Sequence, residues 1–237
     1  MSDDHIVASR PDLSRVERTG IPEVILAETK AHEDLVAIVD AFLRGRGRAI
    51  LSRVKPEQAT ALRARFADVV WEQYGRGRVL IARTDRWVRP VQGGRIGVFA
   101  AGTSDVPVAE EAAVVAREMG CAVATAYDVG VAGIHRLVEP MRVMKADGLD
   151  AVVVAAGMDG ALPSVVAGLV GVPVIGLPVS VGYGVGGQGI GALMAMLQTC
   201  APGLTVVNID NGVGAGATAG LIARRAAMAR GEIAPLG

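Results

Sequence analysis

Apolar residues in the second part of the chain form short runs that alternate with longer stretches of helical spacing. The runs expected to be strands are 96–101, 122–127, 151–156, 172–178 and 205–209, and the stretches expected to be helices are 106–119, 133–145, 161–170, 190–197 and 215–230. Strands that alternate with helices build parallel βαβ units, whose right-handed crossovers place helices on both faces of the sheet. The pattern therefore predicts an α/β domain with a doubly wound parallel sheet.

The first part of the chain has a smaller pattern of the same kind. Its expected strands are 23–28, 49–54, 69–74 and 79–82, and its expected helices are 31–44 and 56–66, the second opening on Pro56. Residues 1–20 are charged and lack a periodic pattern, whereas the polar stretch 83–94 contains Pro90 and a Gly-Gly pair. These features predict a flexible N-terminus over residues 1–20, a small α/β domain over residues 21–90 and a larger domain over residues 91–237.

Composition and charge exclude several classes of protein. The chain has 24 basic and 24 acidic residues, so it has no electrostatic footprint for nucleic acid or an anionic membrane. Two cysteines make no disulfide framework, and no signal peptide opens the chain. The apolar stretch 151–187 is broken by Asp159 and by Pro163, Pro173 and Pro178, so it contains no clean membrane span. We expect a cytoplasmic protein that binds neither nucleic acid nor membrane.

Polar residues follow the expected strands of the larger domain, where doubly wound sheets bind their ligands. Gly102, Ser104 and Asp105 follow the first strand, where one side chain either caps a helix or meets a phosphate or carboxylate. His135 follows the second strand and is either a surface or capping residue or part of a site. Asp159, next to Gly157 and Met158, follows the third strand, and an acid among small apolar residues needs a partner, a cap or a function.

The fourth and fifth strands are followed by glycine-rich loops. Residues 182–189 contain five glycines, after Ser180, in a loop that suits close contact with a ligand. A dinucleotide fingerprint belongs after the first strand, so we reject that reading of the loop. Asp210 and Asn211 follow the last strand. Together, the loops predict a small-molecule site for a polar or anionic ligand at one edge of the sheet.

Cys200 is the candidate nucleophile. A single cysteine in an α/β domain is more often a small buried hydrophobe, and Cys121, at the start of a strand-like run, is such a case. Cys200 instead lies beside Ala-Pro, between a helix and a strand. The residues alone therefore leave both interpretations of Cys200 open.

Five ordered motifs resemble the LarB family. They are GTSDVPVAEEA (102–112), VAAGMDGALPSVVAGL (154–169), PVIGLPVSVGYGVGGQGIGALMAML (173–197), TCAPG (199–203) and VVNIDNGVGAG (206–216). The larger domain is also similar to carboxyaminoimidazole ribonucleotide mutases, and the stretch from Ile21 to Lys30 to the LarB N-terminal region. The resemblance covers about residues 20 to 230 and implies a flavodoxin-like, mutase-type sheet.

The resemblance also implies a reaction. LarB enzymes carboxylate the pyridinium ring of nicotinic acid adenine dinucleotide with CO2 or bicarbonate and hydrolyse its phosphoanhydride. The products are AMP and pyridinium-3,5-biscarboxylic acid mononucleotide, the precursor of the nickel-pincer nucleotide of lactate racemase. No organic cofactor is implied, Mg²⁺ suits the pyrophosphate, and relatives form homo-oligomers, often octamers.

The family's functional residues carry over as expectations. Cys200 aligns with the nucleophile, and Asp159 stands at an acidic position where the family usually has Glu, which makes it the expected base, with His135 in reserve. The expected substrate-binding residues are Ser104, Asp105, Gly157, Met158, Ser180, Gly182, Asp210 and Asn211, and Asp105 and Asp210 are the candidates for Mg²⁺. Two alternatives stay open, namely a mutase-like enzyme on an aminoimidazole nucleotide and a non-catalytic nucleotide-binding subunit.

Overall fold

A computed structural model describes residues 10–233. The chain divides into two compact units, with the division between Val88 and Arg89. Each unit has its own sheet and its own buried core. Among the described residues, no helix is long and apolar enough to cross a membrane.

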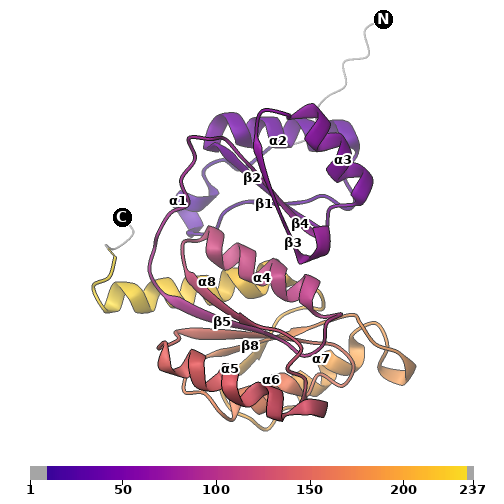
Figure 1. Cartoon of the computed structure of the whole chain (residues 1–237), viewed down its shortest axis with the longest axis vertical. Coiled ribbons are helices and arrows are strands. Elements are labelled where there is room, and N and C mark those ends of the chain that lie inside the picture. The colour runs from indigo at the N-terminus through magenta and orange to yellow at the C-terminus, as the bar shows by residue number, and fades with distance from the viewer. Residues whose placement is uncertain (1–9, 234–237) are drawn as a thin grey trace, which may run out of the picture. The chain divides into compact units, whose positions relative to one another are not determined.

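The first unit is a small mixed sheet (Figure 1). Its elements are α1 (Arg15–Thr19), β1 (Val24–Leu26), α2 (His32–Arg46), β2 (Arg48–Ser52), α3 (Pro56–Arg65), β3 (Val70–Tyr74) and β4 (Val79–Arg83). The strand order is β1-β2-β4-β3, in which only β1 and β2 run parallel. Leu35 and Val39 of α2 are fully buried against Leu51 and Leu80 of the sheet, which explains the helical spacing of apolar residues in α2.

Helix α1 differs from the prediction for the N-terminus. The sequence pattern left residues 1–20 without regular structure, but Arg15–Thr19 is helical and Gly20 ends the helix with φ +73°. Arg15 forms an ion pair of 2.9 Å with Glu23, and Arg46 of α2 pairs with Glu17. One helical turn is too short to show a period in the sequence, and residues 1–9 lie outside the described part of the chain.

The second unit is a parallel sheet with helices on both faces (Figure 1). Its elements are β5 (Arg95–Ala100), α4 (Val106–Glu118), β6 (Ala122–Ala126), α5 (His135–Ala146), β7 (Ala151–Ala156), α6 (Leu162–Ala167), β8 (Val174–Pro178), α7 (Ile190–Leu197), β9 (Leu204–Val206) and α8 (Gly212–Ala229). The strand order is β6-β5-β7-β8-β9, and every pairing is parallel. This is the flavodoxin-like order, so the expected fold class is confirmed.

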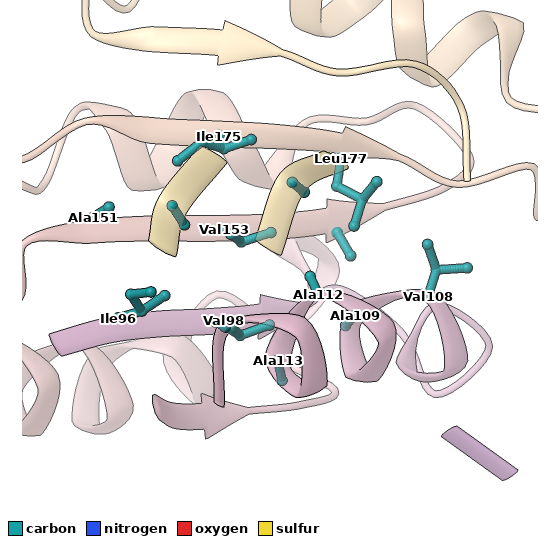
Figure 2. Packing of buried hydrophobic residues seen from close by; sticks show 14 of the residues in the cluster. Ile96, Val98, Val108, Ala109, Ala112, Ala113, Ala151, Val153, Ile175 and Leu177 are labelled. Atoms are coloured by element: carbon teal, nitrogen blue, oxygen red, sulfur yellow. The ribbon is translucent and has the colours of Figure 1, made fainter. Parts of the chain in front are cut away.

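The core explains why the strands read as continuous apolar runs. Alternate residues of β7 point to opposite faces, and both faces are covered. Ala151, Val153 and Ala155 pack in a cluster with α4 and α8. Figure 2 shows Ala151 and Val153 of this cluster with Ala109, Ala112 and Ala113 of α4. Val152 and Val154 pack in a second cluster, with α5, α6 and α7.

The predicted boundaries shift by a few residues. The last strand was expected over 205–209 but ends at Val206, because the Asp210 N–H turns back to donate to the Pro178 carbonyl at 2.9 Å. The third helix of the unit was expected over 161–170, but α6 ends at Ala167. The helix closes on itself there, since the Gly168 N–H donates to the Ser164 carbonyl at 3.2 Å, and periodicity does not locate such helix ends to the residue.

Candidate active site

A cavity of about 580 Å³ lies at the carboxyl ends of β5, β6 and β7. Three loops supply its lining, namely 101–105, 128–132 and 156–162, and Val181 of the loop after β8 completes it. The chain places β6 on one side of β5 and all later strands on the other side, so the topological switch point lies between β5 and β7. Flavodoxin-like sheets bind their ligands at this point. The cavity therefore occupies the position that the fold favours for a small-molecule site, and its volume lies in the usual range for one.

Asp105 forms the floor of the cavity. Its side chain lies between two loops and is only 5 % exposed. One carboxylate oxygen accepts a hydrogen bond from the Gly102 N–H at 2.8 Å, and the other accepts one from the Gly157 N–H at 3.1 Å. Burial raises the pKa of Asp105, and the Asp210 carboxylate raises it further, against the two N–H donors that lower it. Asp105 is thus a positioning group that ties the first loop to the third.

The loops around Asp105 approach each other too closely for side chains. The Met158 N–H donates to the Val181 carbonyl at 2.9 Å, which joins the loop after β7 to the loop after β8. A Cβ atom on Gly157 would lie 2.3 Å from that carbonyl oxygen. A Cβ atom on Gly130 would lie 2.8 Å from the Ala101 carbonyl oxygen. The glycines of these motifs are therefore required by the backbone packing that shapes the cavity.

Strained backbone gathers at this edge of the sheet. Asp128, Met158 and Asp210 each have φ between +52° and +59°, a region that residues with side chains rarely adopt. Each follows a different strand of the sheet, β6, β7 and β9 in turn. Such strain persists where the surrounding structure holds it, and it is concentrated at functional sites.

Five of the predicted site residues line the cavity. These are Ser104, Asp105, Gly157, Met158 and Asp159. The Ser104 and Asp159 side chains are exposed to the cavity, and Asp159 makes one long hydrogen bond, accepted from the Ala161 N–H at 3.4 Å. An exposed hydroxyl and an exposed carboxylate above a buried one can bind and exchange protons with a polar ligand.

Four more predicted residues lie at the same sheet edge but outside the cavity lining. The Asp210 carboxylate accepts a hydrogen bond from the Ser180 N–H at 2.9 Å, so it joins the loops after β9 and β8. Asn211 accepts from the Gly214 N–H at 2.8 Å and caps α8. A Cβ atom on Gly182 would lie 3.6 Å from the Met158 backbone nitrogen, so these two loops approach each other at Gly182. These residues belong to the loops after β8 and β9 and are not part of the cavity lining.

His135 and Cys200 are not brought to the cavity within one chain. His135 is the exposed first residue of α5 and does not line the cavity. Cys200 is exposed, beyond the C-terminal end of α7 and just before β9. The Val174 N–H, at the start of β8, donates to the Gly203 carbonyl at 3.0 Å, so the segment around Cys200 reaches the amino edge of the sheet. The predicted nucleophile and the predicted base therefore lie at opposite edges.

Sequence reasoning missed part of the second loop. Asp128, Gly130, Val131 and Ala132 line the cavity, although only His135 was selected from that stretch. Asp128 directly follows β6, forms an ion pair with Arg136 and has φ +59°, so an acid immediately after a strand was the available signal. No group of three or more His, Cys, Asp or Glu side chains able to hold a metal occurs within residues 10–233.

Comparisons with known proteins cover both units. Residues 4–83 match the model of the LarB/PurE-like N-terminal domain, and residues 95–234 match the model of AIR carboxylase. The chain is 39% identical over 219 residues to an uncharacterized protein of Methanocaldococcus jannaschii, which covers 90% of this chain and 83% of that one. AIR carboxylase-type enzymes act on nucleotide-like substrates, which agrees with a cavity at the switch point of the sheet. The chain therefore belongs to the LarB family, which is related to the carboxyaminoimidazole ribonucleotide mutase class.

Proposed function

We propose that this protein carboxylates the pyridinium ring of nicotinic acid adenine dinucleotide and hydrolyses its phosphoanhydride. CO2 or bicarbonate is the co-substrate, and the products are AMP and pyridinium-3,5-biscarboxylic acid mononucleotide, for nickel-pincer cofactor biosynthesis. The observation that carries the proposal is the cavity at the carboxyl ends of β5, β6 and β7. The motifs at 102–112 and 154–169, which resemble LarB, supply two of its three main loops.

The chemistry requires a nucleophile because a pyridinium ring is electron-poor and does not attack CO2. When a thiolate adds to the ring, the product is a dihydropyridine whose carbon 5 has enamine character. Carbon 5 then forms a bond to CO2, a base removes the proton from carbon 5, and expulsion of the thiolate restores the aromatic ring. Covalent catalysis of this kind replaces one difficult step with several easier ones, and it needs no oxidant.

We assign the steps to residues of this chain. Cys200 is exposed, as a nucleophile must be, and provides the thiolate. Asp159 lines the cavity with a carboxylate that has one long hydrogen bond, so it is the group we assign as base, with His135 in reserve. Ser104 and the backbone around Gly157 and Met158 bind the nucleotide, and Asp105 holds their loops in place.

The loops after β8 and β9 complete the nucleotide site in this proposal. Ser180 and Gly182 lie on the first of them, and Asp210 and Asn211 lie on the second. The substrate pyrophosphate would bring Mg²⁺, which neutralises its charge for hydrolysis. Asp105 and Asp210 are the carboxylates we assign to the ion, because burial raises the pKa of Asp105 and the nearby Asp210 carboxylate raises it further. Both oxygens of Asp105 already accept N–H groups, and the Asp210 carboxylate accepts one from the Ser180 N–H.

One observation favours a second candidate. Cys200 lies away from the cavity within a single chain, and a carboxyaminoimidazole ribonucleotide mutase needs no thiol. A mutase-like activity on an aminoimidazole nucleotide is therefore the alternative that the experiment has to separate.

The test is to incubate the protein with nicotinic acid adenine dinucleotide, bicarbonate and Mg²⁺, and to identify the products by mass spectrometry. The expected products are AMP and a mononucleotide that is heavier than nicotinic acid mononucleotide by one carboxyl group. Both products should be absent with Cys200→Ala. An unchanged dinucleotide with the wild-type protein would reject the proposal, and aminoimidazole nucleotides would be assayed next. Product from Cys200→Ala would keep the reaction but remove Cys200 from it.

A matched pair of variants tests the base. Asp159→Asn keeps the size of the side chain and removes the carboxylate, so turnover should fall by about 10²-fold or more. Asp159→Glu restores the residue usual in the family and should retain turnover. Equal loss in the two variants would mean that position 159 requires a particular shape rather than a carboxylate.

A further inference from the structure

A second cavity of the larger unit lies between α5 and α6, and we call it the α5–α6 groove. Its volume is about 590 Å³, which is in the usual range for a small-molecule site. None of its lining residues also lines the cavity at the carboxyl ends of β5, β6 and β7. The groove is therefore a separate site, which the proposed reaction does not use.

Most of the lining is apolar. The apolar residues are Ile134, Leu137, Val138, Met141, Val165 and Leu169. The first four recur at helical spacing and so form one face of α5. Leu137 and Met141 are buried in the core, whereas Val138 is 65% and Leu169 is 47% exposed. Exposed apolar side chains around a cavity gain free energy when an apolar molecule covers them.

The two remaining lining residues, Arg142 and Lys145, make one end of the groove positive. Ile134 and Lys145 are eleven residues apart, or about 16 Å along the helix axis, so the apolar and positive ends are well separated. The Lys145 ammonium donates to the Leu169 carbonyl at 2.9 Å, which holds it beside the groove. An ammonium has three N–H donors, and this carbonyl takes one. Arg142 pairs with Glu139 at 2.6 Å, so Lys145 is the cation we assign to a ligand.

We propose that the α5–α6 groove binds a small amphipathic anion, whose apolar body lies along α5 and whose carboxylate contacts the Lys145 ammonium. The charge of the lining selects an anion, because it contains two cations and no acidic side chain. The size of the groove selects a small molecule. A specific protein interface takes about 20–30 residues on each side, and only eight residues line this groove. The inference does not depend on the proposed function.

The first test measures the binding of decanoate to the full chain by isothermal titration calorimetry, with decanol and decylammonium as matched probes. Decanoate should bind at one saturable site, about 10-fold or more tightly than decanol, because a hydrogen bond to a charged group is added. Decylammonium should bind more weakly than decanol. Equal affinities for the three probes, or no saturable binding of decanoate, would overturn the proposal.

A pair of variants at position 145 tests the cation. Lys145→Gln removes the charge and should weaken decanoate binding by about 10-fold or more, with decanol binding unchanged. Lys145→Arg keeps the charge and should retain most of the affinity for decanoate. Equal affinities for decanoate in the two variants, both folded by circular dichroism, would contradict the contact with Lys145.

A carboxylate placed on the rim of the groove tests the location. Val138→Glu adds a negative charge to an exposed residue of the lining and should weaken decanoate binding. Val143→Glu is the matched control, because Val143 is an exposed residue of the same helix that does not line the groove. The same loss of affinity in both variants would mean that decanoate binds elsewhere. If Lys145→Gln does not fold, this pair decides.

Competition separates the α5–α6 groove from the cavity of the proposed reaction. Saturating AMP should leave the affinity for decanoate unchanged, because no residue lines both cavities. Displacement of decanoate by AMP would place the probe in the other cavity and overturn the proposal. None of these measurements uses turnover, so a protein that binds decanoate but does not convert the dinucleotide would lose the proposed function and keep the groove.

Discussion

At the scale of single residues, the two cysteines have opposite environments. Cys121 is buried, and its Sγ lies 3.9 Å from the Gly220 carbonyl oxygen, in the core between the sheet and α8. Burial raises the pKa of the Cys121 thiol to about 11. Cys200 is exposed to solvent. The same side chain is therefore a core residue at one position and an accessible thiol at the other.

This difference predicts selective modification by a thiol reagent. At pH 8 a thiol of pKa about 11 is ionised in only about one molecule in a thousand, and burial also blocks the reagent. Ellman's reagent should therefore modify Cys200 rapidly in the native protein and Cys121 only after denaturation. Cys200→Ala should remove the rapid phase, and a rapid phase that remains in this variant would contradict the assignment.

Gly157 is the second residue whose environment is decisive. In Gly157→Ala, the added Cβ atom would lie 2.3 Å from the Val181 carbonyl oxygen and 3.1 Å from the Asp105 carboxylate. The third loop would have to move, so we expect a loss of about 1–3 kcal/mol in unfolding free energy, together with weaker nucleotide binding. Gly182→Ala is the matched control, because its added Cβ would meet its neighbours at 3.6 Å or more. Urea denaturation compares the two, and equal stability would refute the close approach.

At the scale of secondary-structure elements, α4 and α8 pack through their smallest residues. A Cβ atom on Gly216 of α8 would lie 2.3 Å from the carbonyl oxygen of Ala112 in α4. Gly220 makes a similar approach to the side chain of Met119. The glycines and alanines of α8 thus allow two helix backbones to meet above the sheet.

Substitution of Gly216 should separate these two helices. Gly216→Ala forces α8 away from α4, and the expected loss is about 1–3 kcal/mol in unfolding free energy, in spite of the higher helix propensity of Ala. Gly171→Ala is the control, since a Cβ at Gly171 would have nothing within 4 Å. Its effect should stay within about 0.5 kcal/mol. A Gly216→Ala variant as stable as the wild type in urea would show that the helices are not in close contact.

At the scale of the whole molecule, an ion-pair cluster joins the ends of the second unit. Asp150, before β7, is buried and accepts hydrogen bonds from the Arg95 N–H at 2.8 Å and from Arg230, after α8. Arg230 also binds Glu232 at 2.8 Å, and Arg95 lies 3.4 Å from Glu232. The cluster fixes the C-terminal end of α8 to the first strand of the sheet.

The cluster predicts a loss of stability in acid. The hydrogen bond from Arg230 lowers the pKa of Glu232 to about 2, from an ordinary value of 4.5. Because the pKa of Glu232 is lowered in the folded state, the ionised carboxylate stabilises the fold fully above pH 4.5. This contribution to stability disappears as the pH falls toward 2. The melting temperature of Glu232→Gln should therefore lie below that of the wild type at pH 6, and the two should converge near pH 2. A gap that persists at pH 2, or is absent at pH 6, would contradict the role of the ion pair.

The sequence by itself determined the class of fold and the glycine-rich loops. Strands buried on both faces must be apolar throughout, so 151–156 was recognisable as a central strand without any coordinates. The loops 101–105 and 156–162 were identified because polar and small residues interrupt the pattern just after such strands. These features depend on local chemistry and on periodicity, and both can be read along the chain.

Only the tertiary structure decided which of the polar residues meet. The sequence predicts Asn211 as a substrate-binding residue, but its side chain caps α8. Asp128 was not among the predicted site residues, but it lines the cavity. Cys200 lies in a motif that resembles the family. It follows α7, which returns the chain from the carboxyl end of β8 to the start of β9, so Cys200 lies at the sheet edge opposite Asp159. The physical reason is that a crossover helix carries the chain back across the sheet, so position along the sequence does not say which edge a residue reaches.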